Sequence, residues 1–175
     1  MNRIAVDIGE CRLDSDQDIA IEAAWSWLSD EERARAAEFV FEGDRCRFVR
    51  ARGYLRSRLA AHLRLSPRDV PIEVGADGKP FVAGHDLSFN LSHSGAYAVV
   101  AISAAGEVGI DLEVEDRADG LGGQIDGLAD LCMTGEEQAA LAALPPERRV
   151  RRFLSYWTAK EARMKLSGEG FALDP

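Results

Sequence analysis

The feature that most constrains the fold is a change in the spacing of apolar residues near Val70. Before this point apolar side chains recur every three or four residues, most clearly from Phe48 to Leu63, and this spacing predicts a long helix that Asp44 can cap. After it, short apolar runs alternate with turn residues, which predicts antiparallel strands joined by tight turns. Helical and strand patterns are segregated along the chain, so the sequence favours an α+β fold.

Capping signals place the ends of several helices. Ser29 is followed three residues later by Glu32, and Thr134 by Glu137, so each pair is typical of a capping box. Gly168 is suited to end the last helix. We therefore expect helices over about 29–40, 44–66, 134–144 and 147–166. We expect strands over 72–74, 87–91, 97–102 and 108–114, and a loop over the glycine-rich, acidic stretch 116–130.

The chain is acidic overall but contains one basic segment. Its formal net charge is −9 over 175 residues, which argues against general nucleic-acid binding. Between Glu31 and Arg68, however, ten arginines accompany five acidic residues. Such a segment suits a small polyanion or an acidic partner. A solvated, arginine-rich helix face is the alternative, and charge counting alone favours it.

Composition bounds the class of protein. Apolar residues make up 46% of the chain and charged residues 29%, both ordinary for a globular protein. No stretch approaches the roughly 20 apolar residues of a membrane span, and the first residues lack the apolar core of a signal peptide. Cys11, Cys46 and Cys132 are not spaced like metal ligands. We therefore expect a cytoplasmic monomer with reduced thiols and no membrane partner.

The stretch Val108–Val114 alternates apolar and polar residues. On a strand its apolar residues face one side, so Asp111 and Glu113 face the other. Two such carboxylates repel each other unless a cation lies between them, and oxygen ligands suit Mg²⁺. A half-exposed strand with a polar outer face is the alternative, and this stretch taken alone favours it.

The last expected helix continues its apolar stripe with two charged residues. The stripe passes through Phe153 and Trp157, and its next positions are Glu161 and Lys165. A salt bridge between residues four apart explains the pair, and contributes only a few tenths of a kcal/mol. Charges on a core-facing stripe are costly unless they are paired or bound to ions. The pattern supports the salt bridge and a functional site equally.

Two further polar stretches are weak signals by themselves. The first includes Ser92 and His93 at the end of a strand, where their side chains could contact a phosphate or a nucleotide. The second, Asp77–Pro80, is typical of an ordinary hairpin turn. Neither stretch, taken alone, indicates a function.

Together these motifs resemble the 4′-phosphopantetheinyl transferases, and their spacing is similar to that of the Sfp-type branch. The stretches that carry the resemblance are Asn90–Ser94, Val108–Glu113 and Phe153–Lys165. It extends over 28–41, 47–56 and 78–80, and so covers most of the chain. The helix motif combined with the upstream carboxylate motif is highly specific, whereas either alone would not be.

The resemblance implies transfer of 4′-phosphopantetheine from coenzyme A to a serine of an apo acyl- or peptidyl-carrier protein, with release of 3′,5′-ADP. It implies that Asp111, Glu113 and Glu161 hold Mg²⁺, with Mn²⁺ as a possible substitute. Glu161 would also act as general base for the carrier serine. Lys165 would neutralise the pyrophosphate oxygen as 3′,5′-ADP leaves.

The resemblance also implies how coenzyme A binds. Its expected contacts are Arg47, Gly78, Lys79, Pro80, Ser92 and His93, with Arg35 as a further candidate. The family consists of two similar α+β halves with the site between them. Here residues 1–107 would form the coenzyme A-binding half, and residues 108–175 the half with the metal-site strand and the catalytic helix.

Two departures from the family pattern lead to a rival interpretation. Glu32 stands where relatives can place a lysine, so contacts to the 3′-phosphate must differ. The chain also stops at Pro175, where family members continue, so the second half is expected to be incomplete and a chain of this length weakly active. A non-catalytic homologue that binds coenzyme A or a carrier protein is the main alternative. A metal-dependent phosphodiesterase unrelated to carriers is another.

Overall fold

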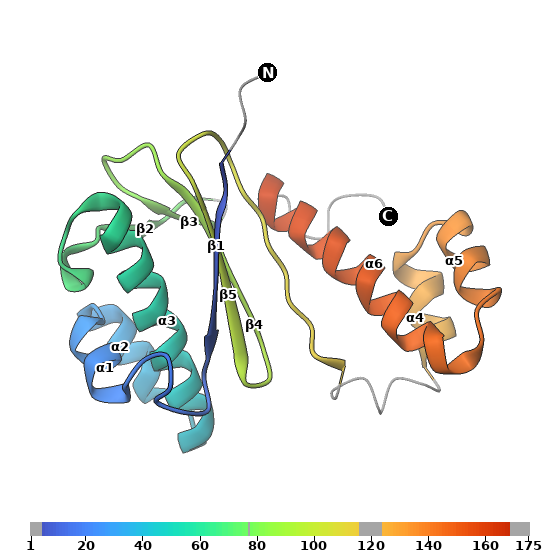
Figure 1. Ribbon diagram of the computed structural model, residues 1–175, viewed down its shortest axis with the longest axis horizontal. Coiled ribbons are helices and arrows are strands. Elements are labelled where there is room, and N and C mark those ends of the chain that lie inside the picture. The colour runs from blue at the N-terminus through green and yellow to red at the C-terminus, as the bar shows by residue number, and fades with distance from the viewer. Residues whose placement is uncertain (1–4, 77, 116–123, 169–175) are drawn as a thin grey trace.

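The computed structural model describes residues 5–76, 78–115 and 124–168 of the chain (Figure 1). The elements in chain order are β1 (Asp7–Arg12), α1 (Ile21–Trp27), α2 (Asp30–Ala37), α3 (Glu42–Leu63), the 3₁₀ turn η1 (Pro67–Asp69), β2 (Ile72–Val74), β3 (Pro80–Val82), β4 (Ser88–Ser94), β5 (Tyr97–Ser103), α4 (Ile125–Cys132), α5 (Gly135–Ala142) and α6 (Pro146–Ser167). The separate groups of helices and antiparallel strands confirm the expected α+β class.

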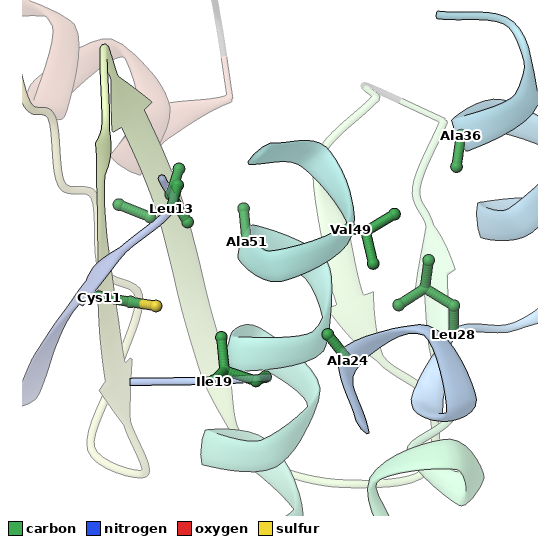
Figure 2. Close-up of a cluster of buried hydrophobic side chains, with 9 residues drawn as sticks. Cys11, Leu13, Ile19, Ala24, Leu28, Ala36, Val49 and Ala51 are labelled. Atoms are coloured by element: carbon green, nitrogen blue, oxygen red, sulfur yellow. The ribbon is translucent and has the colours of Figure 1, made fainter. Parts of the chain in front are cut away.

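The first part of the chain is an antiparallel sheet with helices on one side. Its strand order is β1-β5-β4, and β2 and β3 form a separate two-stranded sheet. Figure 1 shows α3 beside the three-stranded sheet, with α1 and α2 farther out. Apolar side chains of α1, α3 and β1 form one buried cluster, which includes Ala24, Val49 and Cys11 (Figure 2). A second cluster joins Leu55 of α3 to Phe89 of β4.

Helix α6 contacts two different parts of the molecule. Its first half packs with α4 and α5 around the buried side chains of Phe153 and Leu154. Its second half runs toward the sheet, and Figure 1 shows the extended segment 108–114, drawn in yellow, between β4 and α6. The charged positions Glu161 and Lys165 therefore lie on the half of α6 that meets this segment, where Lys160 still pairs with Glu137 of α5.

The expected helix caps are largely confirmed. Both capping boxes form, at Ser29 and at Thr134, because each N-cap hydroxyl accepts from the third amide of its helix. Gly168 ends α6 with a positive φ of 75°, which a residue without a Cβ adopts easily. The expected cap at Asp44 is wrong: α3 begins at Glu42, after Phe41, and Asp44 instead accepts a hydrogen bond from Arg47.

Two further expectations need correction, and two elements were missed. Residues 108–114 are extended but are not a strand, because their amides bond to side chains of β4 instead of to a strand backbone. The stretch 116–130 is not all loop, because α4 begins at Ile125; its residues 116–123 lie outside the described part. The elements β1 and α1 were not expected from the sequence. Helix α1 follows Ala20, which makes no side-chain cap, so it gives no capping signal.

Two remaining expectations concern the end of the chain and the absence of a membrane-spanning helix. The expectation of an incomplete second half concerns residues 169–175 and what would follow them, which lie outside the described residues. Within the described ranges, no helix combines the length and the apolar character that a membrane crossing requires.

Candidate functional site

A row of side chains on β4 fixes the segment 108–114. Alternate residues of a strand point to the same face, so four polar residues two apart along β4 lie in line. Each of them accepts a hydrogen bond from a backbone amide of the segment. The distances are 3.2 Å for Ser88 to Val108, 2.9 Å for Asn90 to Ile110, 3.3 Å for Ser92 to Leu112 and 3.3 Å for Ser94 to Val114. We call these four residues the polar row.

The polar row also contacts the two carboxylates of the segment. The Ser92 hydroxyl donates to Asp111 Oδ1 at 2.8 Å, and the Ser94 hydroxyl donates to Glu113 Oε2 at 2.8 Å. Both carboxylates therefore face the same side, as the alternating sequence predicted. The contacts replace the backbone ladder of a strand pair, so the expected geometry is present without the expected strand.

A glycine allows α6 to approach this segment at backbone distance. A Cβ placed on Gly109 would lie 2.0 Å from the carbonyl oxygen of Ala162 and 2.6 Å from the amide nitrogen of Leu166. No real Cβ tolerates such distances to backbone atoms. Gly109 is thus required by the packing of α6. The sequence placed Gly109 in the carboxylate motif but did not indicate this close approach.

Lys165 makes the direct link between α6 and the segment. Its Nζ donates to Asp111 Oδ1 at 2.5 Å and to Ser92 Oγ at 3.0 Å. Because the Asp111 side chain is only 5% exposed, its charge needs such a partner. A salt bridge between Glu161 and Lys165 was one of the two interpretations of the sequence, and Lys165 pairs with Asp111 instead.

Glu161 lies close enough to these groups to be affected by their charges. Burial raises the pKa of the Glu161 carboxyl, and the negative charge of Asp111 raises it further. Lys165 lowers the pKa, and Glu113 adds a smaller rise. A carboxylate with a raised pKa is a better proton acceptor, and such groups cluster at functional sites.

The residues present fit a divalent cation, although no ready ligand set has formed. In the described part of the chain, no group of three or more His, Cys, Asp or Glu side chains is arranged to hold a metal ion. Asp111 Oδ2, however, is buried without a hydrogen-bond partner, and a hard cation would satisfy such an oxygen. A cation would also relieve the repulsion that raises the pKa of Glu161. The ligand set Asp111, Glu113 and Glu161 stays a prediction.

A cavity of about 370 Å³ lies at the other end of β4. Lys79, Pro80, Ser88 and Leu166 are among the residues that line it. Lys79 Nζ donates to Glu107 Oε2 at 2.5 Å and to the carbonyl oxygen of Leu166 at 2.9 Å, so the hairpin turn touches the end of α6. Two of the three expected turn contacts, Lys79 and Pro80, thus face a hollow that adjoins α6.

The other expected coenzyme A contacts are less closely grouped. His93 is exposed and, one residue from Ser92, belongs to the opposite face of β4. Arg47 pairs with Asp44 at 2.5 Å, and Arg35 pairs with Glu38. Gly78 occupies the turn before β3 with a φ of +82°.

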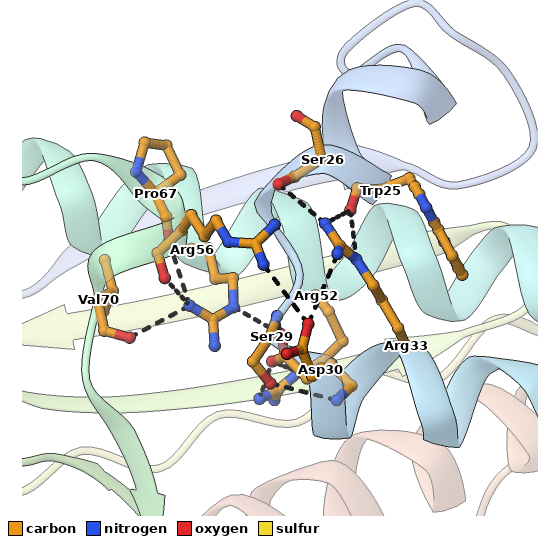
Figure 3. A network of polar contacts seen from close by, with 11 residues as sticks. Trp25, Ser26, Ser29, Asp30, Arg33, Arg52, Arg56, Pro67 and Val70 are labelled. Atoms are coloured by element: carbon orange, nitrogen blue, oxygen red, sulfur yellow. Dashed lines mark hydrogen bonds and ion pairs between the residues drawn. The ribbon is translucent and has the colours of Figure 1, made fainter.

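Much of the basic segment is engaged in ion pairs. Glu32 is only 8% exposed and accepts from Arg52 at 2.8 Å and from Arg56 at 2.5 Å, in the network of Figure 3. The Arg56 guanidinium also donates to the carbonyl oxygens of Pro67 and Val70. Glu32, the departure from the family pattern, is therefore a buried structural partner of two arginines. The charge count alone could not show this pairing.

Comparisons with known proteins connect most of the chain to one family. A family model described as "4′-phosphopantetheinyl transferase superfamily" matches residues 107–175, and one described as "4′-phosphopantetheinyl transferase, N-terminal" matches residues 15–105. The sequence is 37% identical to the 4′-phosphopantetheinyl transferase HetI of Nostoc sp., over 97% of this chain and 68% of that protein.

Two further relatives are matched over a smaller share of their length. A putative 4′-phosphopantetheinyl transferase of Synechocystis sp. is 34% identical over 83% of this chain and 58% of its own length. A 4′-phosphopantetheinyl transferase of Bacillus subtilis is 30% identical over 83% of this chain and 62% of its own length. The chain therefore spans about three fifths to two thirds of these relatives.

Proposed function

Because this chain belongs to the 4′-phosphopantetheinyl transferase superfamily, we propose that it transfers 4′-phosphopantetheine from coenzyme A to a serine of an apo acyl- or peptidyl-carrier protein and releases 3′,5′-ADP. One observation carries the proposal. Lys165 of α6 contacts the buried Asp111 of segment 108–114, and Glu161, on the same helix, lies close enough for the charge of Asp111 to raise its pKa. Transfer of a phosphoryl-type group requires such charge neutralisation and alignment more than covalent help.

A divalent metal belongs to this proposal. Asp111, Glu113 and Glu161 would hold Mg²⁺, since carboxylate oxygens are its preferred protein ligands. When bound, the metal supplies positive charge to the pyrophosphate of coenzyme A. The unpartnered Asp111 Oδ2 supports this assignment.

The protein side chains supply the remaining steps. Glu161 would accept the proton of the carrier serine as the serine oxygen attacks the phosphorus atom and the bond from phosphorus to the 3′,5′-ADP oxygen breaks. Lys165 would place its ammonium beside the oxygen of the leaving 3′,5′-ADP. In the present arrangement this ammonium contacts Asp111, so it would shift toward the substrate when coenzyme A binds.

Coenzyme A would extend from this site along β4. The cavity beside Lys79 and Pro80 would take the adenine, and Gly78 would allow the turn that shapes it. Arg47 and His93 would contact the 3′-phosphate region, for which Arg47 must exchange its partner Asp44 for the phosphate.

Mass spectrometry of an intact carrier protein tests the proposal. An apo carrier incubated with this chain, coenzyme A and Mg²⁺ should gain the mass of one phosphopantetheinyl group. A carrier whose acceptor serine is replaced by alanine should gain nothing, and Glu161→Gln should abolish the gain. Binding of coenzyme A without any gain, across fatty-acid, polyketide and nonribosomal-peptide carriers, would instead support the non-catalytic binder.

A further inference from the structure

Two serines of the polar row contact the carboxylates in an unusual way. Ser94 is 2% exposed and Ser92 is 5% exposed, so neither hydroxyl can rely on water. Each accepts from a backbone amide of segment 108–114 and donates to the carboxylate one residue before that amide. Each hydroxyl thus holds both the backbone and one carboxylate side chain of segment 108–114.

The hydrogen-bonding capacity of Ser92 is fully used. A serine hydroxyl has one proton to donate and two lone pairs to accept with. Ser92 donates to Asp111 Oδ1 and accepts from the Leu112 amide and from Lys165 Nζ. A phosphate of coenzyme A would have to displace one of these groups. The contacts therefore favour a role toward Asp111 over the expected role toward coenzyme A.

We propose that Ser92 and Ser94 are positioning residues, which hold Asp111 and Glu113 in the orientation that binds the divalent cation. The inference rests on the proposed function, because it assigns these serines to the metal site of that reaction. The bond to Asp111 Oδ1 restrains this carboxylate and leaves Oδ2, which is buried and unpartnered, to face a cation. Groups that orient metal ligands typically change metal affinity by 10- to 100-fold when they are removed.

The polar row offers a matched control. Ser88 accepts from the Val108 amide as Ser94 accepts from the Val114 amide, but its hydroxyl donates to Glu107, which is outside the predicted ligand set. Ser88→Ala and Ser94→Ala each remove one amide contact of the segment. Only Ser94→Ala also releases a carboxylate of the predicted metal site.

The test is a titration with Mn²⁺ in which free Mn²⁺ is followed by electron paramagnetic resonance, with saturating coenzyme A present. Ser94→Ala should raise the dissociation constant for Mn²⁺ about 10-fold or more. Ser88 also lines the cavity proposed for the adenine, so each variant is saturated with coenzyme A separately. Under that condition Ser88→Ala should leave the dissociation constant for Mn²⁺ unchanged, and Ser94→Thr, which keeps the hydroxyl, should restore much of the affinity. Melting temperatures without metal identify any variant that does not fold. In that case Ser92→Ala, which releases Asp111, provides the same comparison.

The outcomes separate this inference from the proposed function. If the unmodified chain binds Mn²⁺ and Ser94→Ala binds it equally well, the positioning role is wrong while the transferase proposal stands. Equal weakening by Ser88→Ala would assign the polar row to fold stability alone and would also overturn the inference. If the unmodified chain binds no Mn²⁺, the metal assignment of the proposed function fails, and the positioning role fails with it.

Discussion

At the scale of single residues, Glu161 combines partial burial with two negatively charged neighbours. Burial and the charge of Asp111 both raise the pKa of its carboxyl. The position is reached because Glu161 lies on the face of α6 that continues the buried stripe of Phe153 and Trp157. Two predictions follow from this environment, one for turnover and one for pH.

Glu161→Gln should reduce turnover far more than it weakens coenzyme A binding. The amide fills nearly the same space but cannot take a proton, and general bases typically contribute about 100- to 10,000-fold to rate. Turnover is measured by carrier modification and binding by calorimetry. A mutant with near-normal turnover would show that another group accepts the serine proton.

The carboxyl of Glu161 should titrate above the usual glutamate range in metal-free protein. Since a divalent cation binds the ionised carboxylate, the affinity for Mg²⁺ should fall as the pH drops through this raised pKa. Asp111→Asn removes the neighbouring negative charge and should lower the pKa of Glu161. Carboxyl-carbon NMR of labelled protein measures both values. An unchanged pKa in the variant would place Asp111 too far away to matter.

At the scale of elements, the site depends on how α6 and α3 are held. The backbone of α6 contacts segment 108–114 at Gly109, and the segment in turn is held by the polar row of β4. Helix α3 carries most of the arginines of the basic segment, and many of these are engaged in ion pairs. A substitution in segment 108–114 or α6 should therefore change the positions of the site residues. Replacement of an arginine on α3 should instead change the charge near the site.

Gly109→Ala should separate α6 from the segment and strongly reduce transfer. The added Cβ would overlap two backbone atoms of α6, which cannot rotate away, so the whole helix must shift. Overpacking of this kind typically costs about 1–3 kcal/mol of stability. Melting temperature and turnover are measured together. Gly127→Ala, in α4 with open space around it, is the control and should have little effect on either. Full activity of Gly109→Ala would contradict the close approach.

Arg47→Ala should raise the apparent KM for coenzyme A roughly tenfold and weaken its dependence on salt, because one charge-assisted contact to phosphate is lost. Steady-state kinetics at several salt concentrations measure both effects. Arg45→Ala is the matched control, since Arg45 forms a similar ion pair with Glu42 on the same helix. If the two variants behave alike, Arg47 serves only its ion pair with Asp44.

At the scale of the whole molecule, the proposed site joins two parts of the fold. The sheet and the segment 108–114 supply Asp111, while α6, whose other half packs on α4 and α5, supplies Glu161 and Lys165. A ligand that contacts both parts should stabilise their association. The division into residues 1–107 and 108–175 stays a prediction.

Coenzyme A and Mg²⁺ together should raise the melting temperature by more than the sum of their separate effects. A ligand at one hundred times its dissociation constant stabilises the folded state by about 2.7 kcal/mol, or several degrees for a chain of this size. Thermal denaturation with each ligand, with both and with a chelator measures the effect. Strictly additive shifts would show that the two ligands do not share a site.

The sequence by itself determined the features that depend on near neighbours. The capping boxes at Ser29 and Thr134 formed because each involves groups within one helical turn. The α+β class followed from the change of apolar period, and the common direction of Asp111 and Glu113 followed from their spacing. Such signals act over a few residues and need no partner from elsewhere in the chain.

Only the tertiary structure decided which distant groups meet. The amides of segment 108–114 bond to side chains of β4, and this pairing depends on a serine and asparagine repeat about twenty residues earlier. Gly109 is required because α6 passes at backbone distance, and Glu32 is a structural residue because Arg52 and Arg56 of α3 reach it. These contacts join residues that no local pattern relates, so packing in three dimensions selects them.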